Sequence, residues 1–139
     1  NDKCASGAGT FIETMARALQ LDITKMGDYS LRHKKEISIN AQCVVFAESE
    51  VVSLIHQQTD IEDIAHGIHA GVANRVGSLA RKAGIPDNIM LIGGTGNNKG
   101  VAACLSKELK KEVSVPDGPE YVCATGAAVY AVSLAKQEG

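Results

Sequence analysis

Apolar residues recur at helical spacing in several stretches of the chain, and polar or glycine-rich segments separate these stretches. The longest helix is expected from Asp60 to about residue 83. Its apolar face is formed by Ile61, Ile64, Ala65, Ile68, Val72, Val76 and Leu79. Asp60 to Asp63 reads as a capping box at its start, and Gly84-Ile85-Pro86 as its stop. Three glycines within it, at positions 67, 71 and 77, each cost about 1 kcal/mol relative to Ala, so a closely packed neighbour is expected.

Four other helices follow from the same kind of pattern. Thr10 and Glu13 form a capping box for a helix that ends near Leu19. A short helix over residues 22–35 is expected to end in the solvated basic cluster 32–35, and a brief extended segment follows it at 37–39. Cys43 opens a helix whose apolar face carries Val45, Val52 and Ile55. The last helix is expected over residues 122–136.

A β-α-β unit is expected in the second half of the chain. Residues 89–92 form a buried strand, residues 99–110 a helix and residues 113–115 a second strand. This order predicts two parallel strands with a right-handed crossover. Two strands make a poor sheet alone, so further strands or a partner are expected to complete it.

Composition narrows the class of protein. The 139 residues carry a net charge of −2, which gives no electrostatic case for binding nucleic acid or an anionic membrane. No apolar run is long enough to span a bilayer. Four widely spaced cysteines do not make a disulfide scaffold, so a reduced, cytoplasmic setting is expected. The first residue is Asn rather than Met, which favours a piece of a longer protein.

Two glycine-rich segments are candidates for ligand contact. Gly93-Gly94-Thr95-Gly96 lies between a strand and a helix, where backbone N–H groups can approach a ligand; a tight turn without a ligand fits equally well. It matches neither the P-loop nor the dinucleotide fingerprint. The segment from Gly7 to Gly9 could bring backbone amides near phosphate or ribose, with Glu13 accepting from ribose hydroxyls. A flexible lead into a capped helix explains it too.

Cysteine and histidine positions suggest few other sites. Cys4 and Cys43 lie among polar residues at helix starts, where unpaired N–H groups and the helix dipole stabilise a thiolate, although most isolated cysteines are inert. Cys104 and Cys123 are expected in the core. The four histidines (His33, His56, His66 and His69) show no convincing metal-ligand spacing, and the last two are expected on a helix surface.

Three long motifs carry a family resemblance. They are residues 1–11 (NDKCASGAGTF), residues 43–51 (CVVFAESEV) and residues 91–95 (LIGGT), with the ATGAA run at 124–128. Together they resemble the ATPases of benzoyl-CoA reductase and the activators of 2-hydroxyacyl-CoA dehydratases over essentially the whole chain, with the benzoyl-CoA reductase ATPase subunits looking most similar. The resemblance implies an α/β, actin-like (sugar-kinase-like, ribonuclease H-like) ATPase fold. Residues 1–139 would form a single partial domain of its C-terminal lobe.

The resemblance also implies cofactors and partners. Cys4 and Cys43 fall on the two ligands of a [4Fe–4S] cluster shared between two subunits, and Gly93 and Gly94 fall on the adenosine-side turn. Such proteins form homodimers or pairs of homologous subunits. They take electrons from reduced ferredoxin or flavodoxin and use ATP hydrolysis to pass them to an acyl-CoA reductase or dehydratase. The residues themselves agree with this on one point. A cubane cluster needs four thiolates, and two subunits related by a twofold axis would supply two cysteines each.

One departure limits this expectation. The family's Asp- and Gly-rich phosphate loops precede the first cysteine, and the sequence begins there, so ligands for Mg²⁺ and phosphate would be nearly absent. We therefore expect that these 139 residues alone neither hydrolyse ATP nor bind it tightly. Cys123 stands where a small residue such as Gly is expected. Two alternatives stay open: a cluster-free actin-like kinase or sensor lobe, and a zinc-bridged interaction module using the same two cysteines.

Overall fold

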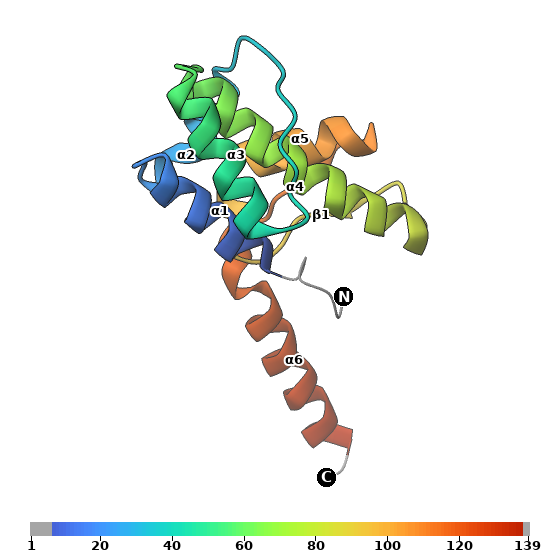
Figure 1. Cartoon of the computed structure of the whole chain (residues 1–139). Coiled ribbons are helices and arrows are strands. Elements are labelled where there is room, and N and C mark those ends of the chain that lie inside the picture. Colours follow the sequence, from blue (N-terminus) through green and yellow to red (C-terminus); the bar gives the residue numbers. More distant parts are fainter. Residues whose placement is uncertain (1–6, 138–139) are drawn as a thin grey trace.

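The computed structural model describes residues 7–137 and is rich in helices (Figure 1). In chain order, the elements are α1 (Ala8–Ala18), α2 (Ile23–Leu31), α3 (Val44–His56), α4 (Ile61–Ala83), β1 (Ile89–Met90), the 3₁₀ turn η2 (Gly94–Asn97), α5 (Lys99–Leu109), β2 (Val113–Ser114), the 3₁₀ turn η3 (Pro119–Tyr121) and α6 (Val122–Gln137).

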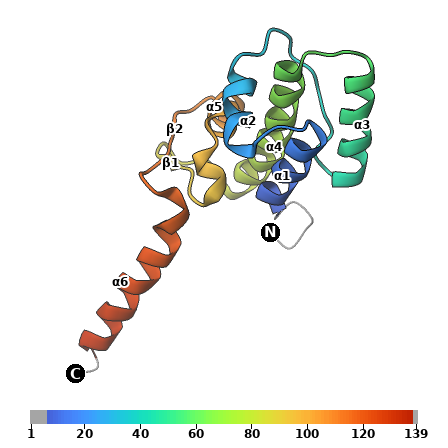
Figure 2. The same cartoon turned by 90° about the vertical axis from the view of Figure 1, so that its left-hand side faces the viewer.

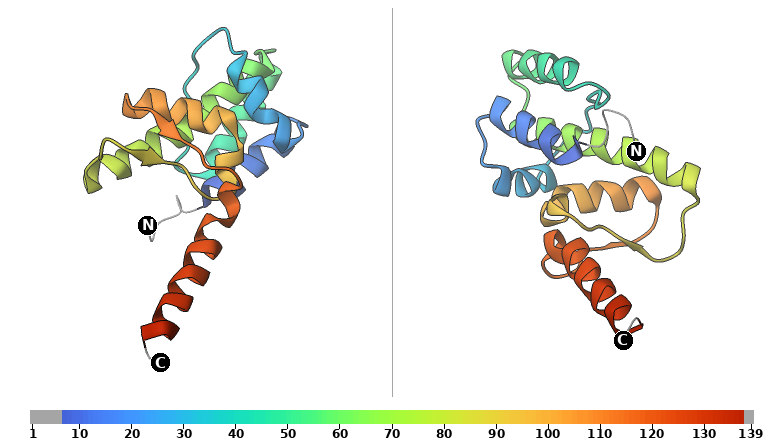
Figure 3. Two further views of the ribbon diagram at one scale, coloured as in Figure 1. Left: turned by 180° about the vertical axis from the view of Figure 1, so that it is seen from behind. Right: turned by 90° about the horizontal axis from the view of Figure 1, so that it is seen from below.

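Helices α1 to α5 form one body, and α6 extends away from it. Two perpendicular views show this arrangement, and the view from behind agrees (Figures 1, 2 and 3). Side chains 123–136 of α6 are exposed, including four large apolar ones at Val129, Tyr130, Val132 and Leu134. Within residues 7–137, no helix combines the length and the apolar character that a bilayer crossing requires.

The long helix α4 is the centre of the body. Its apolar face, with Ile64 and Ile68 fully buried, packs into a core shared with Met15 of α1 and Met26 of α2. A smaller second core lies between α4, α5 and β2 and contains Leu105, Cys104, Leu109, Val113 and Ala73. The expected burial of Cys104 is thereby confirmed.

Close packing explains the glycines of α4. A methyl group on Gly67 would lie 2.9 Å from Ile37 Cγ1, and one on Gly71 would lie 2.6 Å from the carbonyl oxygen of Ile39. The segment before α3 therefore runs directly over the helix backbone at these positions. The close neighbour expected from the sequence is this segment, which forms no strand among the described residues.

Both expected capping boxes are wrong. Helix α1 begins at Ala8, so Thr10 lies inside it, and its carbonyl accepts a hydrogen bond from Thr14 Oγ1 at 2.9 Å. Asp60 does occupy the N-cap of α4, but its side chain makes no capping hydrogen bond. Asp63 is buried and accepts from distant amides instead, those of Lys34 at 2.7 Å and Lys35 at 2.9 Å.

The expected apolar face of α3 is also wrong. Val45, Val52 and Ile55 are exposed, and the buried residues are Ala47 and Val51. α3 packs against α1, and Val44 and Leu54 are partly buried beside these two residues. The face expected to be buried lies on the outer side.

The β-α-β unit is present, with shorter strands than expected. β1 and β2 are parallel, pairing Ile89 with Val113 and Met90 with Ser114. Met90 is 59% exposed, so the expectation of a buried strand at 89–92 is wrong. Cys123 is likewise exposed rather than buried, because α6 stands clear of the body.

Candidate functional site

A cavity of about 510 Å³ lies where α1, α2 and the glycine-rich turn meet. Its lining residues come from three stretches that are distant in sequence: Gly9, Ile12, Glu13, Ile23, Thr24, Gly94, Thr95, Asn97 and Asn98. Ile12 and Ile23 supply apolar surface, and the remaining residues supply a carboxylate, hydroxyls, amides and bare backbone. A mixture of apolar walls and a few polar groups is typical of small-molecule sites.

The glycine-rich turn forms one wall because of its backbone geometry. Gly93 adopts φ +90°, a conformation that L side chains rarely adopt, and its N–H donates to the carbonyl of Pro119 at 2.8 Å. A methyl on Gly96 would lie 2.9 Å from Pro119 Cβ, so the turn is packed tightly on η3. On the other side, a methyl on Gly94 would meet nothing within 4 Å, which leaves its backbone open to a ligand.

Asn98 links this wall to the interior. Its Oδ1 accepts from the amides of Gly100 at 3.0 Å and Val101 at 3.3 Å, so Asn98 caps α5. Its Nδ2 is therefore the group that faces His69 Nε2, at 3.1 Å. Since Nδ2 can only donate, His69 Nε2 accepts and the imidazole is neutral. Burial, reinforced by the nearby charge of His66, lowers the pKa of His69 to about 4.

Two polar residues that line the cavity, Thr24 and Asn97, make hydrogen bonds to neighbouring side chains. Asp22 caps α2 by accepting from the Thr24 amide at 2.9 Å and its hydroxyl at 2.8 Å, and these bonds hold the pKa of Asp22 below its usual value. Asn97 Nδ2 donates to Glu120 Oε2 at 3.0 Å. Thr24 and Asn97 are thus held in place before any ligand arrives.

Four of the six residues predicted to contact a cofactor lie together here: Gly9, Glu13, Gly94 and Thr95. Gly93 shapes the turn without lining the cavity, and Gly7 lines a separate, much smaller cavity beside Phe11. Thr24, Asn97 and Asn98 were not foreseen. The Asn-Asn pair before a helix is an N-cap signal that could have identified the last of these.

Cys43 occupies the N-cap of α3, as predicted. Its side chain makes no capping hydrogen bond, and its thiol is free and half-buried. The first turn of α3 also carries two strongly exposed apolar side chains, Val45 at 67% and Phe46 at 72%. An available thiol beside the open N–H groups of a helix suits a metal ligand. Cys4, the other predicted ligand, lies outside the described residues.

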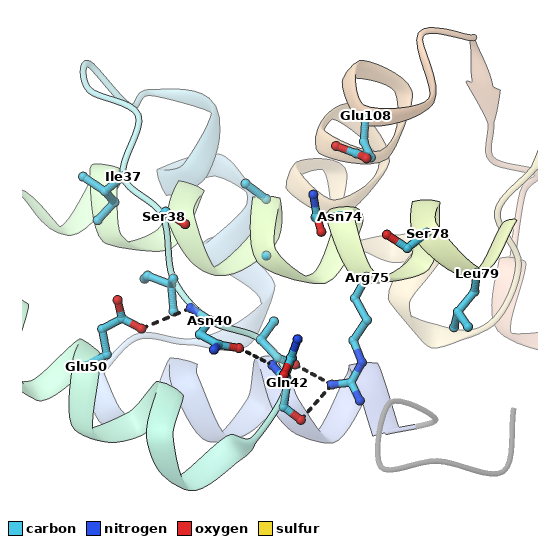
Figure 4. Close-up of a pocket in the computed structure, with 15 residues that line it drawn as sticks. Ile37, Ser38, Asn40, Gln42, Glu50, Asn74, Arg75, Ser78, Leu79 and Glu108 are labelled. Atoms are coloured by element: carbon cyan, nitrogen blue, oxygen red, sulfur yellow. Dashed lines mark hydrogen bonds between the residues drawn. The ribbon is translucent and has the colours of Figure 1, made fainter. Parts of the chain in front are cut away.

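Hydrogen bonds fix the segment leading to Cys43 (Figure 4). Arg75 of α4 donates to the carbonyl of Ala41 and, at 3.1 Å, to that of Gln42. Glu50 of α3 accepts from the Asn40 amide at 3.1 Å. These residues border a second cavity, of about 940 Å³, between this segment, α4 and α5. The position of Cys43 is therefore set by α4 as well as by its own helix.

The histidines of α4 differ from expectation. His66 and His69 are buried, with 7% and 0% of their surface exposed, so their predicted place on a helix surface is wrong. Helices α2 and α5 both pack on the side of α4 that carries these two residues. The basic cluster at 32–35 is mainly exposed, as predicted, and it follows α2 rather than ending it.

The fold is that of the actin-like ATPases. The structure matches that of the activator of the 2-hydroxyisocaproyl-CoA dehydratase from Clostridium difficile with bound ADPNP, at a TM-score of 0.92 and 42% identity. The match covers 99% of this chain and 52% of that one. A second match, at a TM-score of 0.89 and 39% identity, is the (R)-2-hydroxyglutaryl-CoA dehydratase component A of Acidaminococcus fermentans, covering 94% of this chain and 50% of that one.

The chain belongs to the BadF/BadG/BcrA/BcrD ATPase family, because the sequence model of that family matches residues 1–131. This confirms the family expected from the motifs. One of the subunits of benzoyl-CoA reductase from Thauera aromatica is 29% identical over 135 residues, which cover 92% of this chain and 48% of that protein. That identity is lower than those to the two dehydratase activators. The chain spans about half the length of the curated relatives it matches.

Proposed function

We propose that this chain is part of an ATP-dependent activator that supplies low-potential electrons to an acyl-CoA dehydratase or reductase. The observation that carries the proposal is the 510 Å³ cavity, which brings Gly9, Glu13, Gly94 and Thr95 together from distant parts of the sequence. Support comes from relatives whose names describe dehydratase activators, one of them seen with bound ADPNP.

The cavity residues suit the adenosine side of a nucleotide. The open backbone at Gly94 allows a flat base or a ribose to approach, and the Thr95 hydroxyl can donate or accept. The Glu13 carboxylate on α1 lines the cavity and would accept hydrogen bonds from ribose hydroxyls. Ile12 and Ile23 supply apolar contact for the base. Mg²⁺ would accompany the phosphates.

Cys43 suits the iron–sulfur part of the proposal. A [4Fe–4S] cluster supplies one-electron chemistry at low potential and needs four thiolates. The free Cys43 thiol at the start of α3 fits this requirement, and Cys4 would supply a second ligand. A twofold partner, either a second copy or a homologous ATPase subunit, would supply the other two. The exposed Val45 and Phe46 would lie next to that partner. The electron donor would be reduced ferredoxin or flavodoxin.

Nucleotide binding is tested residue by residue with amide NMR. Titration of the ¹⁵N-labelled chain with MgADP should shift the amides of Gly94, Thr95 and Asn98 even if binding is weak. Glu13→Gln should weaken the response about tenfold, the cost of losing a charged hydrogen-bond acceptor. Glu48→Gln, an exposed acid on α3, is the matched control. Shifts that avoid the cavity, or a Glu13 variant that matches the control, would refute this half of the proposal.

Anaerobic iron–sulfur reconstitution tests the other half. A brown dimer with a cluster signal in electron paramagnetic resonance, lost in Cys4→Ser and in Cys43→Ser, is expected. Colourless protein with stoichiometric zinc on the same cysteines would support an interaction module instead. Protein that retains neither metal but binds nucleotide would support a cluster-free kinase or sensor lobe.

A further inference from the structure

Two histidines and a glutamate that are distant in sequence meet beside α4. His33 and Glu36 lie in the segment after α2, and His66 lies on α4. One ligand atom from each residue lies within 4.8 Å of the other two. Two imidazoles and one carboxylate are a donor set that proteins use for zinc and other divalent transition metals. None of these residues belongs to the nucleotide cavity or to the cysteine site.

We propose that His33, Glu36 and His66 form a binding site for a divalent first-row transition-metal ion, with Zn²⁺ the ion that the donor set suits best. The ion would join the segment after α2 to the central helix α4. Three protein ligands leave a fourth position for water.

Hydrogen bonding already prepares His33 for this role. Its Nδ1 lies 2.9 Å from the carbonyl oxygen of Ser30, so Nδ1 carries the proton and Nε2 keeps its lone pair. Metal-binding histidines commonly donate their second nitrogen to a carbonyl in this manner, which fixes the tautomer. Ser30 lies in the last turn of α2, so a carbonyl at the helix end sets the tautomer of His33.

His66 is prepared by its surroundings. It is buried, and its Nδ1 lies 3.8 Å from Cys104 Sγ, which leaves Nε2 as the nitrogen available to an ion. Burial, together with the neighbouring charge of His33, lowers the pKa of His66. A neutral imidazole near neutral pH is the form that binds a metal, because a bound proton would compete with the ion.

Binding requires one movement. The rings of His33 and His66 are stacked, with centroids 3.5 Å apart and planes 5° from parallel. Nitrogen lone pairs lie in the ring planes, so two stacked rings cannot both direct a lone pair at one ion. His33 is only half-buried and follows the helix end, so its ring is the one that must turn. Metal binding should therefore break the stack.

Lys107 of α5 is the competitor for the third ligand. Its ammonium pairs with the Glu36 carboxylate, and this contact lowers the pKa of Glu36. The carboxylate thus stays ionised and available to a cation. Since both side chains are mostly exposed, the ion pair is weak and an ion can displace the lysine. Removing the lysine should strengthen metal binding.

Residue-resolved NMR of the histidine rings tests the site. Replacing Cys4, Cys43 and Cys123 by serine removes thiols that could bind zinc themselves. Titration with Zn²⁺ should shift the ring ¹⁵N resonances of His33 and His66 in a saturable, one-to-one manner and leave those of His56 unchanged. Unchanged His33 and His66 resonances at millimolar Zn²⁺ would overturn the proposal.

Variants separate this site from adventitious binding. His33→Ala and Glu36→Gln alter exposed or half-buried residues, so the fold should persist, and each should weaken binding at least about tenfold. Lys107→Met should strengthen it about threefold, the scale of an exposed ion pair. His56→Ala, on α3, is the matched control and should bind like the parent chain. Equal affinity in His33→Ala and His56→Ala would overturn the proposal.

Discussion

Stability between about pH 7 and pH 5 should depend on His69. This imidazole is fully buried, and its Nε2 accepts from Asn98, an arrangement that requires the neutral ring. Its pKa falls from 6.5 to about 4 on folding. Below about pH 6.5, His69 is protonated in the unfolded chain but stays neutral in the folded chain. Acidification therefore favours unfolding.

The size of the effect follows from the shift. Each unit of pKa difference corresponds to about 1.4 kcal/mol, so His69 should lower the free energy of unfolding by about 2 kcal/mol at pH 5. The effect grows to about 3 kcal/mol near pH 4 and levels off at lower pH, where the folded imidazole is protonated too. Above about pH 7 both states are neutral at this position, and the contribution to pH dependence vanishes.

Urea unfolding followed by circular dichroism at pH 7, 6 and 5 measures this effect. His69→Gln retains an acceptor for Asn98 and cannot titrate, so its free energy of unfolding should fall less steeply with acidification than that of the wild type. His56→Gln removes an exposed histidine and should keep the wild-type slope. Parallel pH dependence of wild type and His69→Gln would refute the assignment of a neutral, buried His69.

Three further outcomes are expected. Gly71→Ala should destabilise the fold by about 1–3 kcal/mol in urea unfolding, because its methyl would lie 2.6 Å from a carbonyl oxygen; Gly94→Ala meets open space, and an equal loss there would contradict the packing argument. Asp63→Ala should cost about 1–3 kcal/mol, since two backbone amides lose a buried carboxylate acceptor, and a cost near zero would contradict that role. Burial raises the pKa of Cys104 to about 11, so Ellman's reagent should modify exposed Cys123 at least about tenfold faster at neutral pH; comparable rates would contradict that burial.

The helical spacing of apolar residues predicted the positions of the helices well. It failed to predict which face of a helix is buried where packing against a neighbour decides this. The stripe on α4 identified Ile64 and Ile68 correctly, because neighbours cover that part of the helix, whereas the predicted Ile61 and Leu79 near its two ends are exposed. On α3 the same reasoning chose Val45 and Val52, although the face against α1 uses alanine and valine at other positions. Hydrophobicity alone does not indicate which side of a helix receives a close neighbour.

Candidate sites show a similar division. The glycine turn and Glu13 were predicted to contact one cofactor, and they line one cavity. The buried histidines were missed because a polar residue on a helix reads as exposed until a packed neighbour is known. Capping failed for a related reason: Asp63 satisfies amides of a loop that is some thirty residues earlier in the chain, a partner that local motifs cannot reveal.

The single side chain of Asn98 has three roles: it caps α5, lines the cavity and donates to His69. The first turn of the helix therefore cannot fray without releasing part of the cavity wall. Hydrogen exchange at the amides of Gly100 and Val101 should register this opening directly. A ligand that contacts Asn98 would slow the exchange of these two amides in proportion to its occupancy. Their exchange rates would therefore report whether the cavity is filled.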